Sequence, residues 1–561
     1  MSTMHPLNLK RGTLSLALVS LASLLLLLVK ATKPQDIMHL HFQKHLQVAH
    51  STCQGTLYPH LCASTLASFP DLPSKSVPQL ICSLVNHTMY EVRSSSSNCT
   101  GLRRKLRNLS PLQQRALDDC LQLFDHTEDE FKTSIADLSQ TQIDSKRYHD
   151  LQTLLSGAMT NVYTCLDGFA DGDPNGKVRR TIQDGLYRIC HHVSNSLAML
   201  KKVKGVKKPS PSEAFPESYG KMKHGFPSWL TSKDRRLLQG TVNETKFDLV
   251  VAKDGSGNFT TIGEAVAAAP NSTKTRFVIH IKAGAYFENV EVIRKKTNLM
   301  FVGDGIGKTI VKAGRNVVDG WTTFQSATVA VVGDGFIAKG ITIENSAGPS
   351  KHQAVALRNG ADLSAFYQCS FVGYQDTLYA HSLRQFYREC DIYGTVDFIF
   401  GNAAAVLQNC GLYARKPNDK QKNLFTAQGR EDPNQNTGIS IISSKVAAAS
   451  DLIPVKSSFQ SYLGRPWKLY SRTVYVECFM EDLIDPAGWL EWNGSFALDT
   501  LYYGEYKNRG PGSDTSRRVK WKGYRVINSS AEASQFTVAQ FIQGPDWLNS
   551  TGIPFFPDLN S

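Results

Sequence analysis

Apolar side chains recur at intervals of three and four residues through much of the stretch from about residue 45 to residue 200. The segment SPLQQRALDDCLQLFDHTEDEFKTSIADLS follows this spacing and has neither glycine nor proline after its second residue. The segment LQTLLSGAMTNVYTCLDGF repeats the pattern. This period is typical of amphipathic helices. Several such helices with short breaks predict an all-α bundle over residues 45–200.

The pattern changes from about residue 245, where short β-rich runs alternate with glycine and asparagine. Examples are RFVIHIKAG, NLMFVGDG and TVAVVGDGFIAKGITIENSAG. No long amphipathic helix separates these runs, so βαβ units fit poorly. The pattern favours an all-β domain over residues 241–561.

A repeat inside this region predicts its architecture. The runs AFYQCSF, QFYRECDI and VLQNCGL place Cys369, Cys390 and Cys410 at intervals of 21 and 20 residues. Such a period fits one coil of a parallel β-helix. Equivalent residues of adjacent coils lie about 4.8 Å apart, within the range of Cα separations across disulfides. A bond between Cys390 and Cys410, or between Cys369 and Cys390, is therefore geometrically reasonable and leaves one thiol free.

Residues 201–240 read as a linker between the two regions. The stretch KKVKGVKKPSPSEAFPESYG is rich in Lys, Pro and Ser and has no periodicity. KDRRLL near its end contains Arg235 and Arg236. Two adjacent arginines in an exposed secretory linker predict a processing site; the alternative is two ordinary surface arginines.

The N-terminal segment, residues 1–35, predicts entry into the secretory pathway. Lys10 and Arg11 precede the apolar run LSLALVSLASLLLLLV, which suits a signal peptide or an uncleaved signal anchor. Asn-x-Ser/Thr sequons, for example at Asn86 and Asn528, agree with secretion and glycosylation. The eleven cysteines would then lie in an oxidising compartment, where disulfides persist.

The positive charge is concentrated in the first half of the chain. The net charge is +13, and residues 1–239 hold 29 Lys and Arg against 19 Asp and Glu. A solvated face or a linker explains such runs, an acidic wall polymer is the next candidate, and nucleic acid is not expected.

Two aspartates occupy equivalent places in consecutive repeats. Asp376 and Asp397 each follow a stacked cysteine by seven positions and are 21 residues apart, so we expect them on one face, close together. Paired carboxylates repel, so one stays ionised while the other has a raised pKa and holds a proton. That division supplies a nucleophile or base and a general acid. Two solvated turn aspartates are the alternative.

At these residues the chain resembles a known family. HQAVALR, GYQDTLY, GTVDFIFGNA, TAQGR and YLGRPW, in this order, are similar to the signature blocks of plant pectin methylesterases, as is GAYFENV. The resemblance covers nearly all of residues 245–561 and implies a right-handed parallel β-helix. The preceding region resembles the pectin methylesterase inhibitor domain, a four-helix bundle.

The resemblance implies roles at individual positions. Asp397 matches the nucleophile and Asp376 the general acid that later becomes the base. Gln375 and Gln353 match the amides that hold the oxyanion, and Arg465 matches the arginine that orients the nucleophile. The residues that match substrate contacts in the sugar cleft are Thr323, Tyr379, Phe400, Trp467 and Trp492, together with Gln353 and Arg465.

The resemblance also implies three disulfides, Cys390–Cys410, Cys53–Cys62 and Cys120–Cys165; the pairing of Cys82, Cys99 and Cys190 stays open. It implies no metal and no organic cofactor. The expected partners are methyl-esterified homogalacturonan, a subtilisin-like processing protease and proteinaceous pectin methylesterase inhibitors, in the plant cell wall.

These residue types suit ester hydrolysis by an aspartate. A carboxylate attacks the C6 ester carbonyl of a methylated galacturonate and forms an acyl-enzyme. A neighbouring guanidinium keeps the nucleophile ionised, and a single oxyanion donor can contribute about 2.7–4 kcal/mol. No G-x-S-x-G elbow supports a serine esterase.

Two other hypotheses fit parts of the sequence. A pectin-active β-helix glycosidase or lyase would also use paired carboxylates, although the two glutamines favour the ester reaction. A binding protein that silences other pectin methylesterases would use the helical half for binding and the second half as a wall-polymer anchor. The leading hypothesis is a zymogen-like pectin methylesterase restrained by its first half until cleavage near Arg236.

Overall fold

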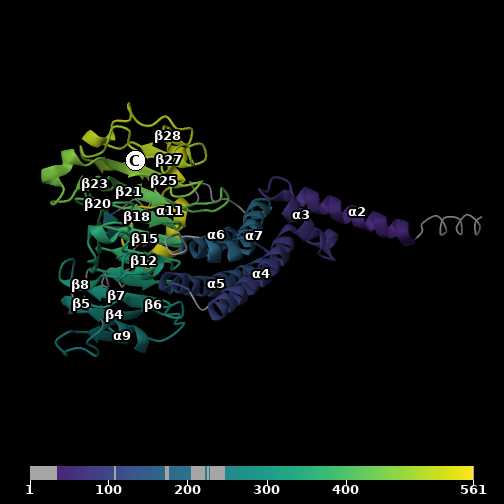
Figure 1. Cartoon of the computed structure of the whole chain (residues 1–561), viewed down its shortest axis with the longest axis horizontal. Coiled ribbons are helices and arrows are strands. Elements are labelled where there is room, and N and C mark those ends of the chain that lie inside the picture. The colour runs from purple at the N-terminus through teal and green to yellow at the C-terminus, as the bar shows by residue number, and fades with distance from the viewer. Residues whose placement is uncertain are drawn as a thin grey trace, which may run out of the picture.

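We describe a computed structural model of the chain (Figure 1) that covers residues 34–106, 109–170, 176–203, 222–223, 226–227 and 247–559. The predicted signal or anchor segment, most of the predicted linker and the Arg235–Arg236 pair lie outside these residues. None of the helices in the described ranges is both long enough and apolar enough to cross a membrane.

The helical half, residues 34–203, is built on four long helices: α4 (Val77–Lys105), α5 (Pro111–Leu138), α6 (Ser145–Asp167) and α7 (Lys177–Leu200). Two further helices, α2 (Pro34–Cys53) and α3 (Pro59–Ala67), precede them. The predicted all-α bundle is confirmed.

Side chains at the helix ends define where α5 and α6 begin. The Ser110 hydroxyl accepts a hydrogen bond from the Gln113 backbone N–H at 3.2 Å, and the Gln113 side chain accepts one from the Ser110 N–H at 2.9 Å. Asp144 accepts the Arg147 N–H at 2.8 Å. Such caps satisfy backbone donors that the helix itself leaves unpaired.

Two of the three implied disulfides are present. Cys53–Cys62 closes the α2–α3 hairpin with a Cα separation of 5.7 Å, and Cys120–Cys165 joins α5 to α6 with a separation of 4.6 Å. Cys82, Cys99 and Cys190 are free thiols; burial raises the pKa of Cys99 to about 12.

Three parallel sheets run along the β-helical half, residues 247–559. The sheets begin with β3 (Leu249–Val251), β5 (Gly284–Phe287) and β6 (Val290–Val292), in that order along the chain. They end with β28 (Tyr524–Val526), β26 (Phe479–Met480) and β24 (Ser461–Gly464).

Successive strands of each sheet belong to successive coils. In the largest sheet β13 (Ser364–Tyr367) pairs with β16 (Arg384–Arg388), and β16 pairs with β19 (Ala404–Gln408), all parallel. Equivalent side chains therefore stack, as Phe366 and Tyr387 do with ring centroids 5.1 Å apart. The predicted parallel β-helix is confirmed.

The predicted Cys390–Cys410 disulfide is wrong. Cys369, Cys390 and Cys410 occupy the same point of three successive coils, and all three are buried free thiols. The Cys390 thiol donates to the Phe366 carbonyl at 3.4 Å, and the Cys410 thiol to the Tyr387 carbonyl at 3.5 Å. The stacked thiols therefore contact one another and the backbone carbonyls around them, but no bond joins their sulfur atoms.

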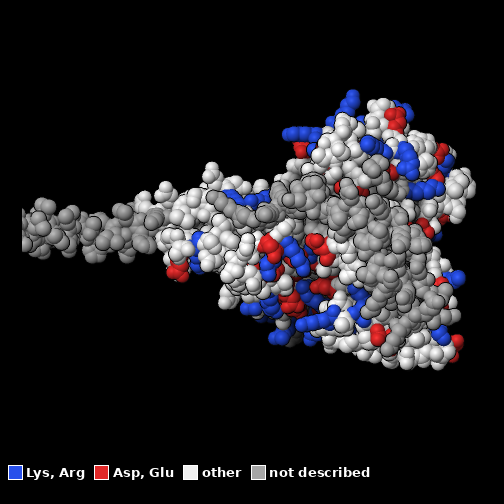
Figure 2. Space-filling model, turned by 180° about the vertical axis from the view of Figure 1, so that it is seen from behind, with Lys and Arg blue, Asp and Glu red and all other residues white. Residues whose placement is uncertain are grey.

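The helical half packs against the flank of the β-helix, with α5 and α6 reaching the sheet that contains β12 (Leu357–Asn359), while α2 points away (Figure 1). Arg294 lies 3.5 Å from Asp129, and Arg384 lies 2.8 Å from Asp150 across this junction. Figure 2 shows acidic and basic side chains interleaved where the helical arm meets the β-helix. Ion pairs therefore join the two halves beside a buried apolar cluster that includes Phe324, Val355 and Phe400 of the β-helical half.

Candidate active site

Asp376 and Asp397 lie on equivalent turns of consecutive coils. Asp376 lies between β14 (Ser370–Val372) and β15 (Leu378–Ala380), and Asp397 between β17 (Asp391–Gly394) and β18 (Ile399–Gly401). Both have left-handed backbones, with φ of 63° and 51°. The Asp376 N–H donates to the Val396 carbonyl at 3.1 Å, which ties one turn directly to the next. The paired-carboxylate prediction therefore matches the backbone geometry.

Arg465 holds the Asp397 carboxylate at two points. Arg465 follows β24, and its Nε and Nη2 lie 2.9 and 2.7 Å from Asp397 Oδ1 and Oδ2. This fork is the strongest arrangement of an arginine with a carboxylate. It fixes the direction in which the carboxylate oxygens point.

Each member of this buried pair stabilises the charged form of the other. Burial raises the pKa of the Asp397 carboxyl, and the Arg465 charge and hydrogen bonds oppose that rise. Burial alone would lower the pKa of Arg465, yet the Asp397 charge raises it. The geometry is that of a carboxylate and a guanidinium, both charged.

Gln353 and Gln375 approach the same place from adjacent coils. The Ala354 N–H donates to the Gln375 carbonyl at 3.2 Å, so the two turns are stacked like those of the aspartates. Both glutamines line one cavity with Asp376 and Asp397. The amides can therefore donate to an oxyanion formed between them and the carboxylates.

Aromatic rings form the walls of this cavity. Tyr379 and Phe400 pair in register between β15 and β18 and stack with centroids 4.2 Å apart. The Phe400 and Trp467 rings lie edge to face at 6.0 Å. The Arg465 guanidinium lies 4.3 Å from the centre of the Trp492 ring, which is 36% exposed. Flat apolar walls beside polar groups suit a sugar ring.

The cavity has a volume of about 330 Å³ and brings together all ten residues that the sequence predicted for catalysis and substrate contact. The helical half also lines it, through Leu112, Thr164, Asp167, Gly168 and Ala170. None of these five residues was predicted from the sequence. A signal exists in α6, where small polar side chains recur at four-residue intervals at Ser156, Thr160 and Thr164, all buried.

Several hydrogen bonds hold α6 over the cavity rim. Thr164 Oγ1 lies 3.0 Å from His381 Nε2, and Lys468 Nζ donates to Asp167 Oδ1 at 2.7 Å. Asn402 Nδ2 donates to Thr160 Oγ1 at 2.8 Å. The helical half thus closes one side of the opening between the aromatic walls.

Comparisons with known proteins agree on both halves. The family model for pectinesterases matches residues 248–545, and the model for plant invertase and pectin methylesterase inhibitors matches residues 47–199. Pectinesterase 2 of Arabidopsis thaliana is 52% identical over 540 residues, which cover 93% of this chain and 92% of that protein.

Two further relatives extend the comparison. Pectinesterase/pectinesterase inhibitor U1 of Solanum lycopersicum is 48% identical over 533 residues, 93% of this chain and 90% of that protein. The solved structure of a pectin methylesterase from carrot has 61% sequence identity and a TM-score of 0.56. It covers 57% of this chain and 99% of that chain.

Proposed function

Because the chain belongs to the pectinesterase family, it removes the methyl esters of pectin as a carboxylic ester hydrolase, and we propose that Asp397 and Asp376 perform this reaction. The observation that carries the proposal is the single cavity in which both carboxylates meet the Arg465 guanidinium and two glutamine amides. The substrate is the methyl ester at C6 of galacturonate units in cell-wall homogalacturonan.

The first half-reaction forms an acyl-enzyme. An Asp397 oxygen attacks the ester carbonyl, and Gln353 and Gln375 donate hydrogen bonds to the oxyanion of the tetrahedral intermediate. The carbon–methoxy bond breaks as Asp376 gives its proton to the leaving oxygen, which departs as methanol. Arg465 aims the nucleophile and holds its negative charge until the attack.

The second half-reaction restores the enzyme. Asp376, now ionised, removes a proton from water, and the resulting hydroxide attacks the acyl carbon of the anhydride. The bond to Asp397 breaks and releases a galacturonate carboxyl group. Asp376 carries the proton in both half-reactions, and the water molecule replaces the proton that left with methanol.

The Gln375→Ala variant tests the oxyanion role. It should lower kcat for methanol release by about 10²–10³-fold with little change in KM, because the donor acts on charge that exists only in the transition state. Gln368→Ala is the matched control, since Gln368 is exposed in the same coil, where its amide donates to Glu389 at 3.2 Å. A rise in KM at constant kcat would contradict the assignment.

We infer that the intact chain is a latent form of the enzyme. The support is the position of α6 along the cavity rim and the hydrogen bonds that hold it there. A polymer of galacturonate needs an open trough, whereas this cavity is closed on one side by the helical half. Cleavage after Arg236 by a subtilisin-like protease in the secretory pathway would release the active β-helical half to the wall.

The Gly157→Leu variant tests latency without changing any residue of the β-helical half. A Cβ at Gly157 would lie 2.6 Å from Leu383 Cδ2 and 3.3 Å from Glu130 Oε1. A leucine there should push α6 off the β-helix. We expect the intact variant to release methanol from pectin at a rate close to that of isolated residues 239–561, while the unaltered intact chain stays much slower.

Gly101→Leu is the control for this experiment. Gly101 lies on α4 in the same half, and a Cβ there meets nothing within 4 Å. This variant should stay latent. Equal rates for the unaltered intact chain and for residues 239–561 would refute latency altogether.

A further inference from the structure

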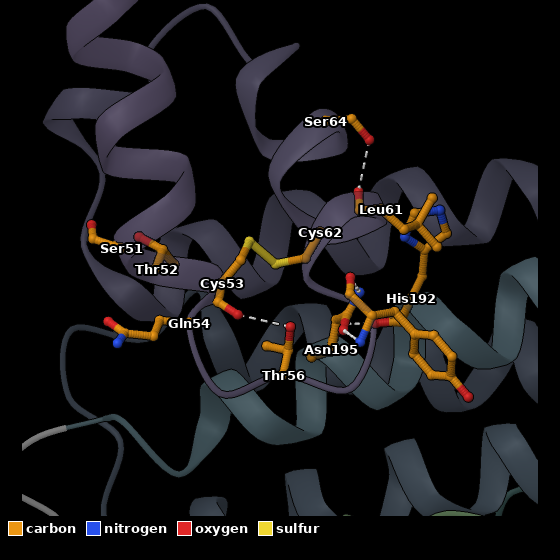
Figure 3. Close-up of a disulfide and its surroundings, with 12 residues drawn as sticks. Ser51, Thr52, Cys53, Gln54, Thr56, Leu61, Cys62, Ser64, His192 and Asn195 are labelled. Carbon is orange, nitrogen blue, oxygen red and sulfur yellow. Dashed lines mark hydrogen bonds between the residues drawn. A yellow bond between two sulfur atoms is a disulfide. The ribbon is translucent and has the colours of Figure 1, made fainter.

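Three metal-binding side chains converge in the helical half, far from the catalytic cavity. His87 and Glu91 lie one turn apart on α4, and His192 faces them from α7. One ligand atom of each lies within 4.8 Å of the others. Figure 3 shows His192 to one side of the Cys53–Cys62 disulfide, which closes the α2–α3 hairpin.

The polar atoms of this cluster lack ordinary partners. His192 is 1% exposed, and its Nδ1 has no hydrogen-bond partner. Its Nε2 lies 3.6 Å from Glu91 Oε2, beyond hydrogen-bond reach, and Glu91 Oε2 is likewise buried without a partner. Buried polar atoms are almost always satisfied, so the unpartnered Glu91 Oε2, which faces His192 Nε2 at 3.6 Å, indicates a missing ligand between these two atoms.

We propose that His87, Glu91 and His192 bind a zinc ion that bridges α4 and α7. Zinc bound by two imidazoles and a carboxylate has bonds of about 2.0–2.2 Å, which places the donor atoms roughly 3.3 Å apart. His192 and Glu91 are already near that separation. Small rotations of the half-buried His87 and Glu91 side chains bring in the third donor, and water fills the fourth position.

The surroundings of Glu91 match those of a metal ligand. Arg188 Nε lies 2.9 Å from Glu91 Oε1 and leaves Oε2 for the ion. An outer partner of this kind fixes the orientation of a coordinating carboxylate. The His87 and His192 rings meet edge to face at 5.3 Å, so both can turn a nitrogen toward the same point.

The donor set selects the kind of metal. Calcium and magnesium require oxygen ligands, whereas imidazole nitrogens suit zinc and related transition metals. Calcium should therefore not occupy this site even in a calcium-rich wall. A zinc ion would join α4 to α7 directly under the disulfide-closed hairpin and stabilise the half that covers the catalytic cavity.

Zinc binding to the purified intact chain tests the proposal. We expect about one zinc ion bound per chain at this site, with its dissociation constant measured by competition with a chromogenic chelator. His87→Gln and Glu91→Gln should each weaken that binding by at least about tenfold, the smaller loss found even for outer-shell partners. Zinc at 100 times its dissociation constant should raise the melting temperature of the helices by about 5 °C.

His60→Gln is the matched control, because His60 is an exposed histidine on α3 outside the cluster. The histidines of HLHFQKH are present in every variant, so they cancel in the comparison. Calcium at the same concentration should not compete. The proposal would be overturned if His87→Gln and Glu91→Gln both kept the zinc affinity of the unaltered chain. It would also be overturned if these two variants bound as much zinc per chain as His60→Gln.

Discussion

Asp397→Asn in the isolated β-helical half should reduce methanol release from methylated pectin by about 10⁴-fold or more, the scale found when a covalent nucleophile is removed. Asparagine keeps the size of the side chain but cannot form the anhydride. The change also removes the negative charge and one of the two Arg465 hydrogen bonds, because the amide nitrogen that replaces one carboxylate oxygen cannot accept. A melting curve should therefore accompany the assay, which measures methanol directly.

Asp376→Asn separates the acid from the nucleophile. It should lower the rate on methyl esters by about 10²–10⁴-fold, the range for general acid–base catalysis. A trifluoroethyl ester of galacturonate, whose leaving group needs little protonation, should recover acyl-enzyme formation in Asp376→Asn but not in Asp397→Asn. If a folded Asp397→Asn protein released methanol at nearly the rate of the unaltered protein, the nucleophile assignment would be contradicted.

The affinity between the two halves should fall by roughly 15-fold between pH 6.5 and pH 8, as proton linkage requires. Two interface carboxyls carry this effect. Burial raises the pKa of Asp119 to about 7 and that of Glu130 to about 8 in the docked chain. Thr322 donates to Asp119 at 2.6 Å, and Arg294 lies 3.8 Å from Glu130.

The sign follows from which state binds more protons. In the separated halves these carboxyls regain ordinary values near 4, so docking takes up protons and weakens as pH rises through the docked pKa values. Two buried histidines act oppositely below about pH 6.5: burial lowers the pKa of His126 to about 3 and that of His381 well below its ordinary value. The other charged groups that face them are Asp118, Asp129, Arg294, Asp334, Arg358 and Asp362.

Below pH 6.5 the two effects nearly cancel, so docking should change little between pH 5 and 6.5. The measurement is the dissociation constant of the two halves after the linker is cut. Glu130→Gln should remove most of the change above pH 6.5. Asp150→Asn, which breaks the 2.8 Å ion pair with Arg384, should weaken binding without altering its slope with pH. An unchanged slope in Glu130→Gln would refute the assignment.

The pairing of Asp376 with Asp397 was predictable because a β-helix is a local structure. The coils that hold these two aspartates return the chain to the same point after 21 residues, so sequence spacing alone puts Asp397 above Asp376. Arg465 is different: it lies 68 residues from Asp397 in sequence, and only the family resemblance pointed to it. The spacing of Cys390 and Cys410 was read correctly as stacking, yet the stacking distance does not determine whether two thiols face each other.

By itself the sequence determined the two kinds of secondary structure, the spacing of the coils around the two aspartates and the pairing of Asp376 with Asp397, because each depends on neighbours within one or two repeats. Only the tertiary structure decided where the helical half lies on the β-helix. At this junction Gly157, Asp119 and Glu130 contact residues more than 150 positions away in the sequence. Such contacts depend on whether the surfaces of the two folded halves are complementary in shape and charge. The periodic sequence patterns within each half do not predict that complementarity.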